Sequence, residues 1–446
     1  MLRLTYRLYR LGSRARHWGT RRLTPAGWLA FSGLLASGAI GINMDQTVAF
    51  QGFALLACLL AVSLSAACFF RGRFAVHRLL PRFGTVGQPL VYGVRVQNET
   101  AKIFRDLELL EDLADSRPTL AEFLAEQQAS TRKGSSRLEE PRWRLMHSAQ
   151  ATFKPIPLPG LPSKGEVEVR AELLPLKRGP LRFTGATLAR PDPLGLFRGF
   201  VHRPLPQTLL ILPKRYPLPS IALPGSRKYQ QGGVALAAPI GESDEFVSLR
   251  DYRPGDPLRR LHWRSWAHAG RPLVKEFQDE FFVRHALVLD TLVGQERSQA
   301  FEEAVSIAAS FACTVNTQES LLDLMFVGPQ AVCFTTGRGL GQAEQALEIL
   351  AAVRCAGDKP FRALQDLVLE HARLVCGCIC IFLDWDGPRR ELVRQLQAVG
   401  LSLLVLIVAE APEAQRIRST SAEDQPENFH VLEVGQIAEQ LQAIKG

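Results

Sequence analysis

The chain has 446 residues, of which 46% are hydrophobic and 22% charged, and its net charge at pH 7 is +9. This composition is typical of a folded protein with two or three domains, and it excludes a disordered or low-complexity chain. The basic excess lies in residues 1–82, which hold eleven arginines, no lysine and one acid, Asp45. The remaining residues carry 42 basic and 43 acidic side chains. Because the body is electrically balanced, we expect no nucleic-acid partner.

Residues 1–22 combine two helical periodicities. Arginines and leucines each recur at three- and four-residue steps on different faces: Arg3, Arg7, Arg10 and Arg14 against Leu4, Leu8 and Leu11. This pattern predicts a basic amphipathic helix that lies on the anionic inner leaflet of a lipid bilayer. A disordered basic tail is the alternative interpretation.

Two uncharged runs follow at residues 23–44 and 46–70, separated by Asp45. Each is long enough to cross a hydrocarbon core of roughly 30 Å as a helix, so residues 23–70 are predicted to form a transmembrane hairpin. Arginines flank both outer ends: Arg21 and Arg22 before the first run, and Arg71, Arg73, Arg78 and Arg82 after the second. Basic flanks stay in the cytoplasm, so both termini are expected there. A cleaved signal peptide or a buried core helix is the alternative.

Residues 84–215 are predicted to form a β-sandwich-like domain. The stretches "PLVYGVRVQNE" at 89–99 and "EVEVRAELLPL" at 166–176 alternate between apolar and polar residues, as half-buried antiparallel strands do. The alternation fails at about 113–163, which we interpret as an insertion. Residues 216–284 are assigned to a linker rich in Pro and Gly, followed by a segment of unusual motifs.

From residue 285 to residue 446, short apolar strands alternate with amphipathic helices. This pattern predicts a parallel sheet covered on both faces. Two of its strands end at Asp290 and Asp384, and ligands of such sheets bind beyond the carboxyl ends of the strands. The "CGCIC" run at 376–380 is interpreted as buried reduced thiols of a core strand, because the zinc alternative requires a paired cysteine knuckle that the sequence lacks.

The stretch "GESDEFVSLRDYRPGDPLRRLHWRSWAHAGRPLVKEFQDE" at 241–280 is the least ordinary part of the chain. Its Glu-Phe pair, R-x-Y, Pro-Gly-Asp turn, R-x-L-x-W and basic-acidic end resemble, in this order, the signature of the DUF58 family. "KRGP" at 177–180 and "DPLGLFR" at 192–198 also resemble the β region of that family. The resemblance supplies these candidate interaction residues: Glu245, Phe246, Arg250, Tyr252, Pro254, Gly255, Asp256, Arg259, Trp263, Lys275 and Glu276.

The resemblance covers nearly the whole chain and implies a bacterial inner-membrane protein. The expected fold is two N-terminal transmembrane helices, a β-sandwich-like domain, and a C-terminal α/β domain similar to von Willebrand factor A domains (vWA-like, Rossmann-type). The implied partners are a MoxR-type AAA+ ATPase and, in some cases, a transglutaminase-like membrane protein. The family brings no defined biochemical activity and no cofactor.

One departure concerns the metal site of metal-dependent vWA domains. Such a site has D-x-S-x-S after the first strand, because a carboxylate and two hydroxyls supply oxygen ligands to Mg²⁺. Here the sequence is "DTLVG", so Leu292 and Gly294 stand at the serine positions. Asp290 and Asp384 are interpreted as a degenerate metal-site remnant that binds no metal. The alternatives are a weakly held hydrated ion with Thr291 as a displaced hydroxyl, and aspartates that cap neighbouring helices.

Residues 251–270 are interpreted as an ion-paired clasp. Residues 241–280 mix eight acids with seven basic side chains, whereas a phosphate-binding surface carries one sign of charge. Four arginines are expected to pair with carboxylates: Arg250, Arg253, Arg259 and Arg264. Asp256 is expected to cap the segment after it. Trp263 and Trp266 are expected to pack against the sheet, with base stacking as the alternative.

These observations favour a membrane-anchored scaffold or interaction protein over an enzyme. The sequence contains no P-loop, nucleophile elbow or H-E-x-x-H motif. The alternative is an enzyme or accessory factor of cell-envelope metabolism that uses residues 251–270 as its site. In that case His262 or His268 would act together with Asp256.

Overall fold

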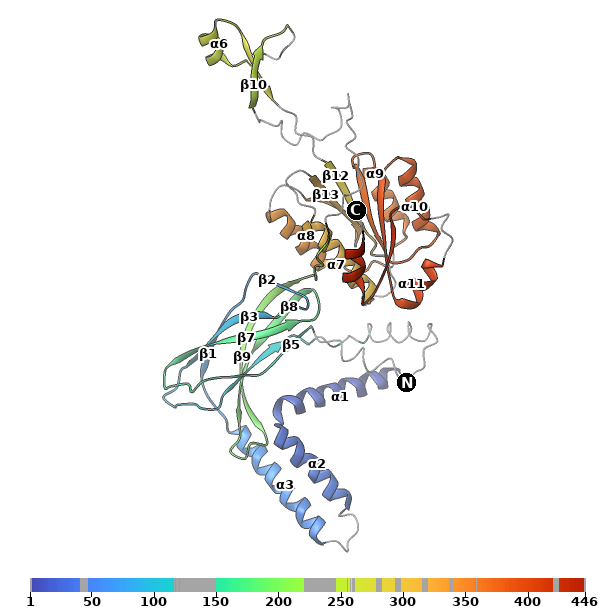
Figure 1. Ribbon diagram of the computed structural model, residues 1–446. Coiled ribbons are helices and arrows are strands. Elements are labelled where there is room, and N and C mark those ends of the chain that lie inside the picture. Colours follow the sequence, from blue (N-terminus) through green and yellow to red (C-terminus); the bar gives the residue numbers. More distant parts are fainter. Residues whose placement is uncertain are drawn as a thin grey trace. The chain divides into compact units, whose positions relative to one another are not determined.

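The computed structural model describes residues 2–40, 47–115, 117, 120, 150–219, 246–254, 256, 258, 261–277, 283–292, 298–314, 320–336, 340–357, 359–419 and 425–444. The chain divides into two compact units, Met1–Lys214 and Arg215–Gly446, and each is described by itself (Figure 1). Most of the predicted insertion at 113–163 lies outside the described residues, as does Asp45.

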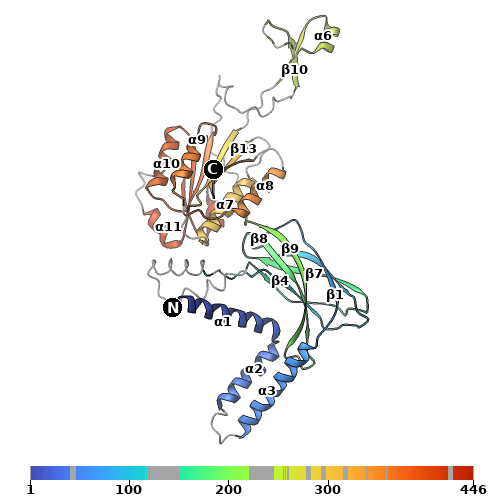
Figure 2. The same ribbon diagram turned by 180° about the vertical axis from the view of Figure 1, so that it is seen from behind.

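Three helices begin the first unit: α1 (Leu2–Arg22), α2 (Pro25–Ile40) and α3 (Thr47–Cys68). Within α3, Val48–Cys68 is long and apolar enough to cross a membrane, with a mean hydropathy of 2.1. The 16 residues of α2 are apolar, but they span only about 24 Å at 1.5 Å per residue. The described part of the chain therefore contains one helix of spanning length, and α2 lies beside it (Figures 1 and 2).

A β-sandwich makes up the rest of this unit. One sheet has the strand order β1-β3-β7-β5 and the other has the order β2-β9-β8-β4-β6. The strands are β1 (Phe74–Leu79), β2 (Phe83–Thr85), β3 (Leu90–Asn98), β4 (Glu108–Leu113), β5 (Ala151–Phe153), β6 (Ile156–Pro157), β7 (Glu166–Pro175), β8 (Gly179–Pro191) and β9 (Arg198–Leu212). The inward side chains of both sheets share one hydrophobic core, and β3 and β7 show the predicted alternation.

A buried ion pair crosses this core. β1 begins at Phe74, before the predicted start of the domain at residue 84, and contains Arg78. The sequence placed Arg78 among the basic residues at the membrane surface, but its side chain is fully buried and pairs with Glu111 of the other sheet. Tyr92 also donates a hydrogen bond of 3.0 Å to Glu111. Because the guanidinium of Arg78 has hydrogen-bond partners, it is stable at an inward-facing position of β1. Composition alone would place such a charged side chain at the surface.

The second unit contains a six-stranded sheet of order β14-β13-β12-β15-β16-β17. Its strands are β12 (Val283–Leu289), β13 (Ser320–Val327), β14 (Ala331–Thr336), β15 (Gly377–Phe382), β16 (Ser402–Ala409) and β17 (Phe429–Glu433). β14 runs antiparallel to β13 and the other pairs are parallel, so the expectation of a wholly parallel sheet was wrong at this edge. Residues 328–330 join β13 to β14, and a parallel pair requires a much longer crossover.

Helices cover both faces of this sheet (Figures 1 and 2). One face carries α7 (Gln299–Thr314) and α8 (Leu340–Ala352), and the other carries α9 (Arg362–His371), α10 (Gly387–Ala398) and α11 (Ala411–Arg418). A last helix, α12 (Ile437–Ala443), contacts β17. In β15, Cys378 and Cys380 are buried free thiols, as predicted, whereas Cys376 precedes the strand and is only partly buried.

The signature segment forms a small element of its own. Strands β10 (Phe246–Asp251) and β11 (Leu273–Phe277) pair antiparallel, and α6 (Trp263–Ala269) lies between them in sequence. No strand was predicted in this region. β10 lacks a clear alternation of apolar and polar residues, and it ends in the charged residues Arg250 and Asp251.

Candidate functional site

An ion pair closes the turn that follows β10. Arg250 donates two hydrogen bonds, each of 2.7 Å, to the carboxylate of Asp256. The same carboxylate accepts a bond of 2.9 Å from the backbone N–H of Arg253. The hydrogen bonds from Arg250, which have the largest effect, and the bond from the Arg253 N–H lower the pKa of Asp256 to about 2. The carboxylate therefore closes the turn before it. The predicted cap by Asp256 of the segment after it involves residues that lie largely outside the described ones.

The remaining signature residues are distributed along the hairpin. Phe246 lies in β10, Lys275 and Glu276 lie in β11, and Tyr252 and Pro254 follow β10. The N–H of Tyr252 donates to the carbonyl of Pro272 (3.0 Å), so backbone pairing continues past the end of β10. Three signature residues lie outside the described residues: Glu245, Gly255 and Arg259.

Two tryptophans of α6 stack on each other. Trp263 and Trp266 are three residues apart, which places them on one face of the helix. Their ring centroids are 5.2 Å apart and their planes differ by 19°. Trp263 is 63% exposed, so the expectation that it packs against a sheet was wrong. Exposed tryptophans are enriched where proteins bind other proteins.

The structure gives His262 and Asp256 different partners. The Nδ1 atom of His262 lies 2.6 Å from Oγ of Ser265, within the first turn of α6. The Asp256 carboxylate is bound by Arg250. In the described part of the chain, no recorded contact joins Asp256 to His262 as the enzyme interpretation requires.

An arginine binds the aspartate that ends β12. Asp290 is fully buried, and Arg389 from the start of α10 donates to its Oδ2 from Nε (2.8 Å) and Nη2 (2.6 Å). Arg389 also pairs with Asp386, the N-cap of α10, at 2.7 Å. Although burial acts to lower it, the pKa of Arg389 is raised by Asp290 and Asp386. The guanidinium therefore supplies the positive charge that this edge of the sheet requires.

These residues do not fit a divalent ion. Asp290 Oδ1 accepts from the N–H of Leu292 (2.9 Å), and Oδ2 is bound by Arg389. Asp384 is about half exposed and pairs with Arg416 at 3.5 Å. Among the described residues, no group of three or more His, Cys, Asp or Glu side chains could hold a metal. The alternative interpretation, in which Asp384 caps the neighbouring helix, does not hold, because Asp386 is the residue that caps α10.

Arg389 was missed by the sequence reasoning. A signal was present in "DWDGPRR" at 384–390, where an Asp-Gly-Pro helix start is followed at once by two arginines. A carboxylate buried at a strand end requires a cation or several donors. A basic residue in the first turn of a helix that follows a neighbouring strand was therefore the candidate partner for Asp290.

The "DPLGLFR" segment joins the sandwich to the apolar helices. Asp192 accepts hydrogen bonds from Oγ of Ser63 in α3 (2.6 Å) and from the backbone N–H of Phe197 (2.7 Å). Burial acts to raise the pKa of Asp192, but these hydrogen bonds hold it below its ordinary value. Phe197 packs in a small cluster with Leu23 and Ala67 at the ends of the two helices.

Two glycines in this joint allow backbone to approach backbone. A Cβ at Gly27 of α2 would collide with the carbonyl of Leu196, and a Cβ at Gly199 of β9 would collide with the carbonyl of Ala67 in α3. The motif therefore has a structural role that the sequence did not reveal: it fixes both apolar helices to the sandwich.

Two comparisons place the chain among known proteins. Residues 248–374 match the family described as "Protein of unknown function DUF58". The chain is also similar to Uncharacterized protein YeaD of Bacillus subtilis (strain 168), with 27% identity over 258 residues. That alignment covers 56% of this chain and 61% of the relative, less than two thirds of its length. The matched family range begins within β10 and includes the Arg250–Asp256 turn, the α6 tryptophans and the first strands of the α/β sheet, so this part of the chain is similar to the DUF58 family.

Proposed function

We propose that this protein is a membrane-anchored scaffold whose signature hairpin binds a partner protein. The observation that carries the proposal is the stacked pair Trp263 and Trp266, with Trp263 63% exposed, in the same hairpin segment as the Arg250–Asp256 ion pair. Exposed tryptophans are typical of protein-protein hot spots. The proposed partner is a MoxR-type AAA+ ATPase, which would remodel or assemble a membrane or envelope complex. A transglutaminase-like membrane protein is a further proposed member of that complex.

The membrane arrangement belongs to this proposal. α3 is of spanning length, and we propose that α2, extended by the residues that follow it, forms the second span. Arg21 and Arg22 precede α2, and Arg71 and Arg73 follow α3. Basic residues at both outer ends support a bacterial inner-membrane protein with both termini in the cytoplasm.

The vWA-like assignment of the second unit is also a proposal. The strand order, with β12 central and the chain turning to its other side at β15, is that of doubly wound α/β sheets. A single antiparallel edge strand is common in such sheets. The Asp290–Arg389 pair supports a vWA-like domain that recognises partners without a metal ion.

A binding experiment tests the scaffold proposal. The full chain in detergent, immobilised, is titrated with the purified MoxR-type ATPase of the same bacterium. Replacing both tryptophans (Trp263→Ala with Trp266→Ala) should weaken binding by about thirtyfold, equivalent to about 2 kcal/mol for a tryptophan hot spot. Leu374→Ala, at a side chain 40% exposed in the α/β unit, is the matched control and should bind normally. Equal binding by all three proteins would contradict the proposal.

The contact between His262 and Ser265 supports a second candidate, an envelope enzyme that uses residues 251–270. A base within 2.6 Å of a hydroxyl can activate it as a nucleophile. The same geometry also arises between side chains in the first turn of a helix. Loss of a measured hydrolytic activity in both His262→Ala and Ser265→Ala, with ATPase binding unchanged, would favour the enzyme.

A further inference from the structure

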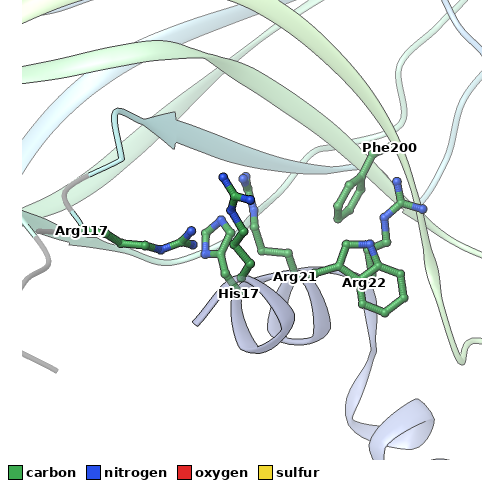
Figure 3. Close-up of a pocket in the computed structure, with 7 residues that line it drawn as sticks. His17, Arg21, Arg22, Arg117 and Phe200 are labelled. Atoms are coloured by element: carbon green, nitrogen blue, oxygen red, sulfur yellow. The ribbon is translucent and has the colours of Figure 1, made fainter. Parts of the chain in front are cut away.

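A cationic pocket lies at the end of α1, in the first unit. The pocket has a volume of about 330 Å³ and is lined by basic and aromatic side chains alone. Its basic side chains are Arg14, His17, Arg21 and Arg22 of α1, together with Arg117; its aromatic side chains are Trp18 and Phe200. In Figure 3 the side chain of Arg117 extends toward His17, and Phe200 lies beside Arg22. Residues far apart in sequence thus surround one small space with positive charge.

The pocket has more positive charge than its neighbouring carboxylates balance. Arg21 pairs with Asp112 at 2.6 Å and Arg117 pairs with Asp115 at 3.5 Å. Within the described residues, no carboxylate partner is recorded for the other two arginines, Arg14 and Arg22. The guanidinium of Arg22 instead lies 5.0 Å from the ring centroid of Phe200. Two arginines are therefore available to an anion.

The positive charges around the pocket also affect the pKa of His17. Burial is the largest cause that lowers the pKa of His17, and the charges of Arg21 and Arg117 lower it further. At neutral pH the imidazole is therefore uncharged and can donate a hydrogen bond without adding to the repulsion among the arginines.

The surroundings of the pocket indicate a lipid surface. Three apolar side chains of α1 are exposed: Leu8 (61%), Leu11 (62%) and Trp18 (49%). Their spacing of three and seven residues places them on one face of the helix. After α1 the chain reaches α2 within three residues, and α1 runs at an angle to the α2–α3 pair (Figures 1 and 2). An amphipathic helix in this position lies in the interface with its apolar face toward the acyl chains.

We propose that this pocket binds the phosphate group of an anionic phospholipid. Arg14 and Arg22 would bind the phosphate oxygens, His17 would donate a further hydrogen bond, and Trp18 would lie at the headgroup level. The inference rests on the proposed membrane anchoring and adds to it a specific headgroup site. A free phosphate compound has the same chemistry, but the apolar face beside the pocket favours the lipid as its source.

The test uses the full chain in a neutral detergent and the fluorescence of its tryptophans as the readout. The ligands are short-chain phosphatidylglycerol, short-chain phosphatidylcholine and inorganic phosphate. Phosphatidylglycerol should bind at least about tenfold more tightly than either of the others, because it combines a net negative charge with acyl chains. Equal binding of inorganic phosphate would overturn the assignment to a lipid.

A matched pair of double variants separates the pocket from general electrostatic attraction. Arg14→Gln with Arg22→Gln removes two charges inside the pocket and should weaken phosphatidylglycerol binding about tenfold or more. Arg10→Gln with Arg16→Gln removes two charges of the same helix outside the pocket and should change binding less than twofold. Equal losses in both would overturn the proposal. Extraction of either protein from membranes by alkaline carbonate would instead contradict the proposed anchoring, whatever the lipid titration gives.

Discussion

Two Arg–Asp pairs, one in the α/β sheet and one in the signature hairpin, use the same chemistry in different surroundings. Arg389 and Asp290 have side chains that are 8% and 0% exposed, whereas Arg250 and Asp256 are 35% and 15% exposed. Both arginines bind the carboxylate through two nitrogens. The buried pair neutralises a charge that no water can solvate, while the hairpin pair fixes the shape of a turn. The presence of an Arg–Asp pair in a family signature therefore does not by itself indicate how much that pair contributes to the free energy of unfolding.

The largest expected effect is at the buried pair. Arg389→Ala leaves Asp290 buried without its cation, which should cost about 3–5 kcal/mol. The transition of the α/β unit in the detergent-solubilised full chain should fall by several degrees, since about 2–4 °C corresponds to 1 kcal/mol in domains of this size. Arg416→Ala, at a side chain 69% exposed, is the control and should melt like the wild type.

The double variant Arg389→Leu with Asp290→Leu sharpens this result. If the cost arises from an unpaired charge, replacing both partners by apolar side chains should restore much of the lost stability. A double variant as unstable as Arg389→Ala would show that packing around the guanidinium, rather than charge pairing, stabilises this edge.

A smaller effect is expected at the hairpin pair. Arg250→Gln should leave the melting of both units close to that of the wild type, because the pair is partly hydrated. Its signature is the titration of Asp256, whose pKa is lowered to about 2, chiefly by Arg250. A lowered folded pKa stabilises the turn above the ordinary value of 3.8, and this contribution is lost as the pH falls through about 2. In Arg250→Gln, NMR of the labelled aspartate carboxyl carbons should show the pKa of Asp256 rising toward 3.8; no rise would contradict the pairing.

The smallest expected effect is that of divalent ions. Because Arg389 binds Asp290, adding millimolar Mg²⁺ or Mn²⁺ should not shift the melting of the α/β unit, and calorimetry should detect no binding tighter than millimolar. A micromolar metal-binding site that Asp290→Ala abolishes would contradict this prediction. In that case Arg389 would have to leave the carboxylate when the ion binds.

Much of the secondary structure followed from periodicity, because alternation over several residues determines which face of a strand is buried. The strands β3 and β7 and the α/β alternation after residue 285 were predicted in this way. β1 was not, because Arg78 occupies one of its inward positions. The direction of β14 depended on a short connection rather than on its own residues, so strand composition could not predict it.

The site residues were harder to predict than the strands. The signature located Arg250 and Asp256, but the exposure of Trp263 depends on which neighbours pack against α6, and the sequence does not specify them. Arg389 binds a residue 99 positions earlier. The basic pocket likewise unites α1 with Phe200 and Arg117, and no local pattern predicts that union.

The glycine contacts at Gly27 and Gly199 have a mechanical consequence. Where a side chain separates two elements, it can change rotamer and let them slide, but backbone in direct contact with backbone cannot. The sandwich and the helices α2 and α3 should therefore move as one rigid body, with the "DPLGLFR" loop as the rigid connection between them. A force applied to the sandwich would tilt α2 and α3 with it instead of being dissipated at the joint.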